Sequence, residues 1–69
     1  MPSFRYRDQS YEYTLTRSAR KTLGIYVHPD LSVEVRAPLD APLPDITTRV
    51  HKRRRWIVRQ LQELSLYHP

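Results

Sequence analysis

A stretch near the C-terminal end of the chain places its apolar residues on one side of an α-helix, and this spacing constrains the fold most. At about 100° per residue, five apolar side chains fall within roughly 60° of one another: Ile46, Val50, Ile57, Leu61 and Leu64. A β-strand cannot produce this spacing, because its side chains alternate between two faces. We therefore expect one long helix over residues 43–67, with a single apolar face that another layer has to cover.

Three stretches before this helix alternate apolar and polar residues, as half-buried β-strands do. They span residues 10–17, 23–28 and 33–37, and the breaks between them are about four residues long. Short breaks are typical of strands that pair with their neighbours in sequence. The predicted fold class is α+β, with a three-stranded antiparallel meander at residues 10–38 followed by one long C-terminal helix packed on one sheet face (β-β-β-α).

The remaining residues and the length of the chain complete this prediction. Residues 1–9 show no clear period, so we expect a frayed lead-in or a weak extra strand there. A chain of 69 residues is enough for one small domain with a thin core. A core this thin favours a domain that leans on a partner or on further chain.

The predicted helix is longer than the predicted sheet. A helix of about 24 residues spans about 36 Å, whereas a strand of about seven residues spans about 23 Å. The last turns of the helix should therefore project beyond the sheet and leave apolar groups exposed, which usually marks a partner surface. The candidate partner-binding residues in or near this part are Trp56, Leu64, Leu66 and Tyr67.

The positive charge of the chain is concentrated on the same helix. The net charge is +5, and residues 46–62 hold six of the twelve Lys and Arg residues but no Asp or Glu. On a helical wheel these basic residues occupy nearly every direction outside the apolar stripe, as on an ordinary solvated surface, whereas a groove-reading helix concentrates them on one side. The alternative is weak, salt-sensitive nucleic-acid binding, with phosphate contacts from Arg49, Lys52, Arg55 and Arg59.

The sequence offers no constellation for catalysis or metal binding. The three histidines, His28, His51 and His68, stand on a predicted strand, the predicted helix and the tail, and there is no HExxH motif. The chain has no cysteine, and no serine lies in a nucleophile-elbow pattern. His28 and Asp30 could supply two ligands, but a zinc site needs at least a third. We therefore expect no catalytic residue, no metal-binding residue and no enzyme activity in this chain alone.

Hydropathy and cysteine usage bear on the compartment. No apolar run approaches the roughly 20 residues of a membrane span, and residues 1–10 lack the hydrophobic stretch of a secretion signal. The absence of cysteine fits a reducing compartment, where disulfides are rare. We therefore expect a cytoplasmic protein with no membrane contact.

Three short motifs resemble one known family. They are R-x-T-L-x-I-x-V at residues 20–27, V-E-V-R-x-P at residues 33–38 and R-R-x-W-I at residues 53–57. In this order they resemble the N-terminal part of the YgjP-like predicted metal-dependent hydrolases, a zinc-metallopeptidase-type family, and the resemblance extends from about Tyr11 to Leu64. One departure is Leu31, which stands where the family often has glycine in the turn between two strands.

The resemblance implies a role without catalysis for this chain. The zinc site of the family is carried by an HExxH helix and a further histidine, downstream of the part that this chain resembles, so no residue here has a catalytic or metal-binding counterpart. Zinc is expected only in such a downstream catalytic region. The implied role is a non-catalytic N-terminal module that packs against that region or a protein partner. The alternatives are a small nucleic-acid-binding module and a homodimerising adaptor that uses the same apolar surface.

Overall fold

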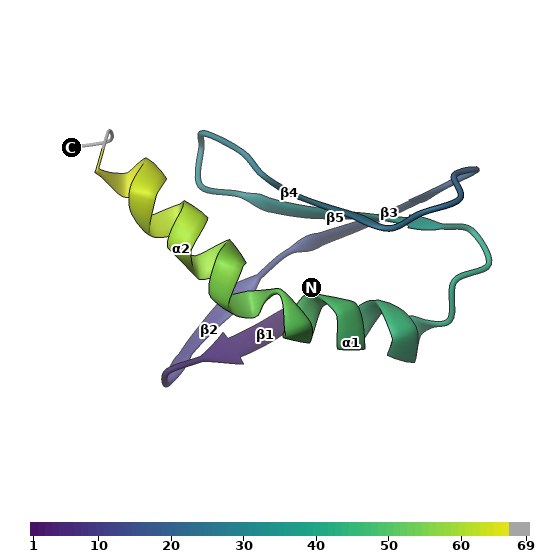
Figure 1. Ribbon diagram of the computed structural model, residues 1–69, viewed down its shortest axis with the longest axis horizontal. Coiled ribbons are helices and arrows are strands. Elements are labelled where there is room, and N and C mark those ends of the chain that lie inside the picture. The colour runs from purple at the N-terminus through teal and green to yellow at the C-terminus, as the bar shows by residue number, and fades with distance from the viewer. Residues whose placement is uncertain (67–69) are drawn as a thin grey trace.

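The computed structural model describes residues 1–66 and shows two helices lying across one side of two small β-sheets (Figure 1). The α+β class is therefore confirmed, but the arrangement differs from the prediction. The elements in chain order are β1 (Ser3–Tyr6), β2 (Gln9–Glu12), β3 (Thr14–Ser18), β4 (Gly24–Val27), β5 (Val33–Pro38), α1 (Leu43–Lys52) and α2 (Arg54–Ser65).

The larger sheet has the strand order β3–β5–β4, so the predicted meander is wrong. β5 lies in the centre, pairs antiparallel with β4 and pairs parallel with β3. At the end of β3, the Arg17 guanidinium donates hydrogen bonds to three carbonyls at and after the end of β5, those of Pro38, Leu39 and Ala41, the last at 2.7 Å. These bonds fix the segment that leads into α1 beside the end of β3, where an antiparallel neighbour would have no such contact.

The first strand of the prediction, residues 10–17, is divided between the two sheets. β1 and β2 form a separate antiparallel hairpin, so residues 1–9 hold the extra strand that was one of the two alternatives expected there, and they are not a frayed lead-in. Its two turn residues, Arg7 and Asp8, both have left-handed backbones (φ 49° and 66°), as a two-residue type I′ turn requires. The chain passes from this hairpin into β3 at Tyr13, whose backbone N–H donates to the Pro2 carbonyl at 3.0 Å.

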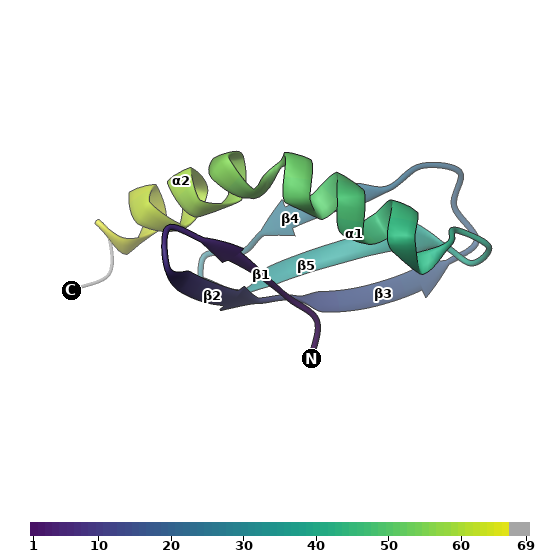
Figure 2. The same cartoon turned by 90° about the horizontal axis from the view of Figure 1, so that it is seen from below.

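The predicted single helix is two helices that meet at Arg53, which has a non-helical backbone (φ −102°, ψ 6°). The Arg54 guanidinium donates to the His51 carbonyl at 2.8 Å, in addition to the backbone N–H bonds that the carbonyls of Arg49, Val50 and His51 accept at the bend. The bend directs α1 along the larger sheet and α2 past the β1–β2 hairpin (Figure 2). The C-terminal end of α2 extends past both hairpin turns, as the length mismatch predicted.

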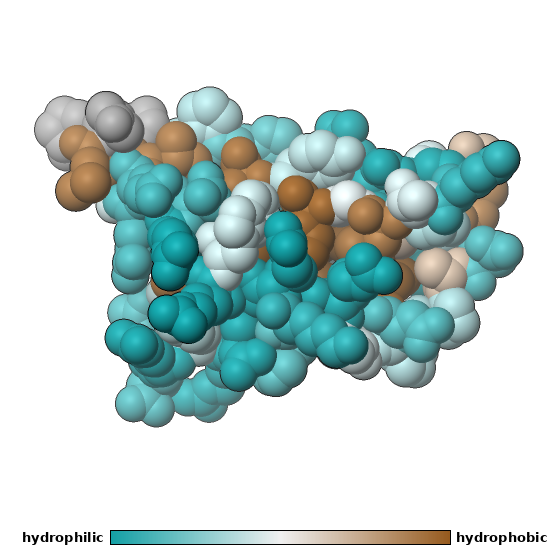
Figure 3. All heavy atoms as spheres, viewed as in Figure 1, coloured by the Kyte–Doolittle hydropathy of each residue, from teal (hydrophilic) through white to brown (hydrophobic). Residues whose placement is uncertain are grey.

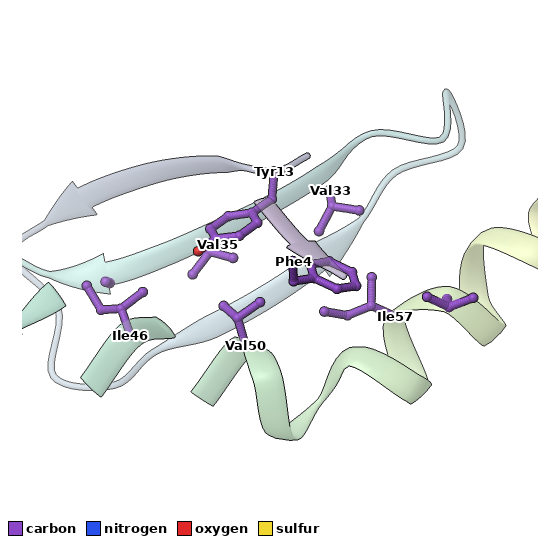
Figure 4. Close-up of a cluster of buried hydrophobic side chains, with 9 residues drawn as sticks. Phe4, Tyr13, Val33, Val35, Ile46, Val50 and Ile57 are labelled. Carbon is purple, nitrogen blue, oxygen red and sulfur yellow. The ribbon is translucent and has the colours of Figure 1, made fainter. Parts of the chain in front are cut away.

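The apolar stripe of the helices faces the strands, as predicted. Ile46, Val50 and Ile57 are at most 1% exposed and point toward the sheets (Figure 4). The aromatic ring of Phe4 enters the same core and stacks on Tyr11 at 5.3 Å between ring centres. The buried core consists of Phe4, Tyr13, Val33, Val35, Ala37, Ile46, Val50, Ile57 and Val58.

Candidate functional site

The face of the larger sheet that the helices leave open carries a polar network centred on Glu34. Its carboxylate accepts a hydrogen bond from Arg36 and contacts Nε2 of His28, both at 3.1 Å. These two partners, Arg36 first, lower the pKa of Glu34 from its ordinary value. Tyr26 joins the network because the Arg36 guanidinium lies 4.7 Å from its ring centre. Each of these groups already has a partner of its own, which is typical of a solvated sheet face.

The histidines and carboxylates do not form a metal site in the part of the chain that the structure describes. His28 pairs with Glu34 rather than with Asp30, whose carboxylate accepts two hydrogen bonds from Ser32. Within residues 1–66, no three His, Cys, Asp or Glu side chains gather where they could hold one ion. His51 is exposed on α1, and His68 lies outside the described residues. The described residues therefore do not fit the zinc of the resembled family.

Basic side chains gather between the β1–β2 hairpin and α2. There they line a cavity of about 450 Å³, which we call the hairpin cleft. The side chains that matter for its chemistry are Tyr6, Arg7, Gln9, Tyr11, Arg55 and Arg59. Arg55 and Arg59 are four residues apart and so share one face of α2, and Arg7 comes from the hairpin turn opposite them. No Asp or Glu is part of the wall of this cleft.

A second groove continues the hairpin cleft over the outer side of the helices. It has a volume of about 370 Å³, and it shares Arg55 and Arg59 with the hairpin cleft. Lys52, Arg53 and Trp56 complete its wall. The Trp56 side chain is 36% exposed, and the Arg53 guanidinium lies 5.0 Å from its ring centre. We call the two cavities together the basic groove.

The structure thus unites three of the four basic residues that the sequence singled out and separates the fourth. Lys52, Arg55 and Arg59 line the basic groove, whereas Arg49 lies beside Leu23 and Ile25 at a different cavity. Sequence reasoning missed Arg7, because the β1–β2 hairpin was not predicted. The signal was present in the alternation of Phe4 and Tyr6 with arginines.

Hydrophobic side chains form a band between β4 and the helices that runs toward the end of α2 (Figure 3). We call this surface the apolar band. β4 is an edge strand that pairs with β5 alone within residues 1–66. Leu66 is 83% exposed, and the other members are partly exposed. The apolar band consists of Leu23, Ile25, Leu61, Leu64 and Leu66.

The four candidate partner-binding residues therefore separate into two groups. Leu64 and Leu66 belong to the apolar band, whereas Trp56 lies among the arginines of the basic groove. Tyr67 lies outside the described residues.

Comparisons with known proteins bear out the resemblance noted in the sequence. A family model described as YgjP-like, metallopeptidase domain matches residues 21–68, which is most of the chain. Searches of curated proteins and of solved structures returned no match. Among the described residues, neither helix has the length and apolar character needed to cross a membrane. From the family match, the chain belongs to the YgjP-like metallopeptidase-domain family.

Proposed function

We propose that this chain serves as a non-catalytic module of a YgjP-like metallopeptidase and packs against a catalytic region through the apolar band. The observation that carries this proposal is the uncovered continuation of the core stripe. Ile57 is fully buried beneath the strands, but Leu64, on the same side of α2, is only partly covered, and Leu66 is 83% exposed. Burying a leucine side chain contributes roughly 1.5–3 kcal/mol of favourable free energy. A partner that covers this surface would therefore gain binding free energy from it.

The edge of β4 supports the same contact. Its backbone groups on the side away from β5 face no strand within residues 1–66, and Leu23 and Ile25 lie partly exposed beside them. An edge strand next to an apolar surface offers both hydrogen bonds and burial to an incoming segment. A catalytic region of the same family is the occupant that we propose, and zinc would belong to that region.

The experiment has two parts, a sequence and a binding measurement. Reading the coding sequence beyond codon 69 shows whether an HExxH motif follows, as the resemblance implies for a catalytic region. The binding measurement titrates this chain against a separately produced YgjP-like catalytic region by isothermal calorimetry. Sedimentation of the chain alone, at about tens of micromolar, tests the homodimer alternative.

Two leucine variants make the binding measurement specific. Leu66→Asp changes an exposed member of the apolar band, and Leu39→Asp introduces the same charge at a residue that is 64% exposed in the turn before α1. We expect Leu66→Asp to weaken binding at least tenfold and Leu39→Asp to change it less than twofold. Trp56→Ala in the same titration tests whether the tryptophan contributes, as the sequence suggested.

Three results would contradict the proposal. If the two aspartate variants bound the catalytic region with equal affinity, the apolar band would not be part of the interface. If the chain did not bind the catalytic region, that region would not be its partner. A chain that sediments as a dimer and becomes monomeric on Leu66→Asp would replace this proposal with the homodimerising adaptor.

A further inference from the structure

We propose that the basic groove binds the phosphate groups of single-stranded nucleic acid, with Arg7, Arg55 and Arg59 each contacting a phosphate in the hairpin cleft. This site consists of other residues than the apolar band and does not depend on the function proposed above. It rests on the charge of the cleft, on the way in which Arg7 is held and on the aromatic rings along the groove.

The positive charge of the hairpin cleft is not balanced by ion pairs within the described part of the chain. Three guanidinium groups line it without a carboxylate. The ion pairs found within residues 1–66 both involve Glu34, on the open face of the larger sheet, and include none of these arginines. Like charges brought together repel one another, and an anion bound between them would relieve that repulsion.

Arg7 is held in place by its backbone and by its neighbour. Its left-handed backbone (φ 49°) is fixed by the two-residue turn of the hairpin, and its guanidinium lies 5.4 Å from the ring centre of Tyr6. A left-handed backbone is uncommon for arginine and costs about 1 kcal/mol or more. The hairpin turn therefore places Arg7 in the wall of the cleft, with its guanidinium beside Tyr6, another residue of that wall.

The other polar groups of the cleft are also suited to an anion. The Tyr11 hydroxyl donates to the side-chain oxygen of Gln9 at 2.9 Å, a bond that does not use the two N–H donors of the Gln9 amide. Arginine and amide donors without acidic acceptors match a phosphate, whose oxygens only accept hydrogen bonds.

The second half of the groove explains why the ligand should be a strand rather than a single phosphate. Beyond Arg55 and Arg59, the groove reaches Lys52 and the partly exposed ring of Trp56. Positive charge along a track, with aromatic rings beside it, is the usual design of single-strand binding surfaces. A duplex fits less well, because the β1–β2 hairpin lies against α2 and would block entry of this helix into a major groove.

The test measures fluorescence anisotropy of a labelled oligothymidylate of about 12 nucleotides, a length within the range of known single-strand sites. Three phosphate contacts predict that the logarithm of affinity falls with the logarithm of salt concentration at a slope of about −2. Arg7→Asn removes one contact while asparagine still tolerates a left-handed backbone. We expect this variant to bind at least fivefold more weakly at about 50 mM salt and to lower the steepness of the slope by about 0.7.

Arg5→Gln is the matched control, because it removes the same charge from β1 at an exposed residue that does not line the cleft. We expect it to weaken binding less than twofold, and Arg55→Gln to behave like Arg7→Asn. Equal losses for Arg5→Gln and Arg7→Asn would overturn the site and leave only general attraction by a basic protein. No binding at about 50 mM salt, or equal affinity for a duplex of the same length, would contradict the proposal that the ligand is single-stranded nucleic acid.

Discussion

At the residue scale, the turn between β4 and β5 contains a leucine in a conformation that favours glycine. Leu31 has φ 70°, and its N–H donates to the His28 carbonyl at 2.9 Å. Together with Pro29 and Asp30 it forms a three-residue loop, of which Leu31 is the last residue. Glycine is common at the left-handed last position of such loops. This chain therefore has a strained residue at a position that favours glycine.

We predict that Leu31→Gly stabilises the protein. Relief of the left-handed backbone gains about 1–2 kcal/mol, and the greater freedom of glycine in the unfolded chain takes back about 0.5–1 kcal/mol. The free energy of unfolding should therefore rise by up to about 1.5 kcal/mol, and Tm by a few degrees. Urea denaturation measures the change. Leu39→Gly, at an exposed residue without a positive φ, should be neutral or destabilising, and a similar gain there would contradict the explanation.

The Glu34 network makes a second prediction, about pH. The pKa of Glu34 is lower in the folded protein than its ordinary value of 4.5, because Arg36 and His28 bond to its charged form. A lowered pKa contributes stability above the unfolded value that is lost as pH falls through the folded value. Glu34→Gln should therefore lower Tm at pH 7, and the difference from wild type should narrow as pH falls below 4.5.

Thermal melts from pH 3 to pH 7 would check this dependence. Glu12→Gln is the control, because Glu12 takes part in no ion pair within residues 1–66. The difference in Tm between Glu12→Gln and wild type should not narrow on acidification as the difference for Glu34→Gln does. A Glu34→Gln difference that stays constant on acidification would show that the carboxylate charge contributes nothing.

At the scale of elements, the β1–β2 hairpin is part of the core rather than an appendage. Phe4 is 7% exposed and packs with Tyr11 and Tyr13. We predict that Phe4→Ala lowers the free energy of unfolding by about 3–5 kcal/mol. That loss is comparable to the total stability of a chain of this length, roughly 3–10 kcal/mol, so Phe4→Leu provides a milder variant that stays folded.

Chemical denaturation followed by circular dichroism measures these losses. Arg5→Ala, one residue away on the solvent side of β1, should change stability by no more than about 0.5 kcal/mol. A Phe4→Ala variant as stable as Arg5→Ala would mean that the hairpin folds independently of the helices.

The elements differ in how far the sequence could predict them, and the reason is physical. Alternation along β4 and β5 determines which face of a strand is buried, so their positions agree closely with the prediction. Alternation does not determine which strand lies beside which, so the parallel pairing of β3 with β5 was missed. The even alternation of residues 10–17 likewise hid the passage from one sheet to another at Tyr13, since each half obeys the same period.

Only the part of the candidate site that comes from one continuous stretch of sequence could be predicted. The basic residues of α2 and the exposed end of that helix follow from helical spacing, which links residues three and four apart. Arg7 enters the basic groove through the placement of a hairpin some 50 residues away in sequence, which no local pattern encodes. The separation of Trp56 from Leu64 and Leu66 also depends on which face of α2 the hairpin covers.

At the scale of the whole molecule, electrostatic repulsion should reduce stability. The net charge is +5, residues 46–62 hold six Lys and Arg residues without an Asp or Glu, and the ion pairs found within residues 1–66 include none of these six. We predict that raising the salt concentration from about 20 mM to about 300 mM increases Tm by a few degrees, because screening weakens the repulsion. Calorimetric melts measure this shift.

An Arg55→Gln, Arg59→Gln double variant should melt higher than wild type at low salt, and the advantage should shrink at high salt. Sodium chloride is the salt of choice, since phosphate would bind the site that we propose and confuse the two effects. A wild-type Tm that falls with added sodium chloride would show that attraction, rather than repulsion, dominates the surface charges.

The central position of β5 also fixes an order of assembly. The β1–β2 and β4–β5 hairpins join strands that are close in sequence and can form within about 1–10 µs, whereas β3 has to close a loop around the whole of β4 before it meets β5. During synthesis, β3 is made before β5 and remains without its neighbour until residues 33–38 have also been made and have left the ribosome. The polar residues Thr14, Thr16 and Arg17 would keep this unpaired strand hydrated while it waits.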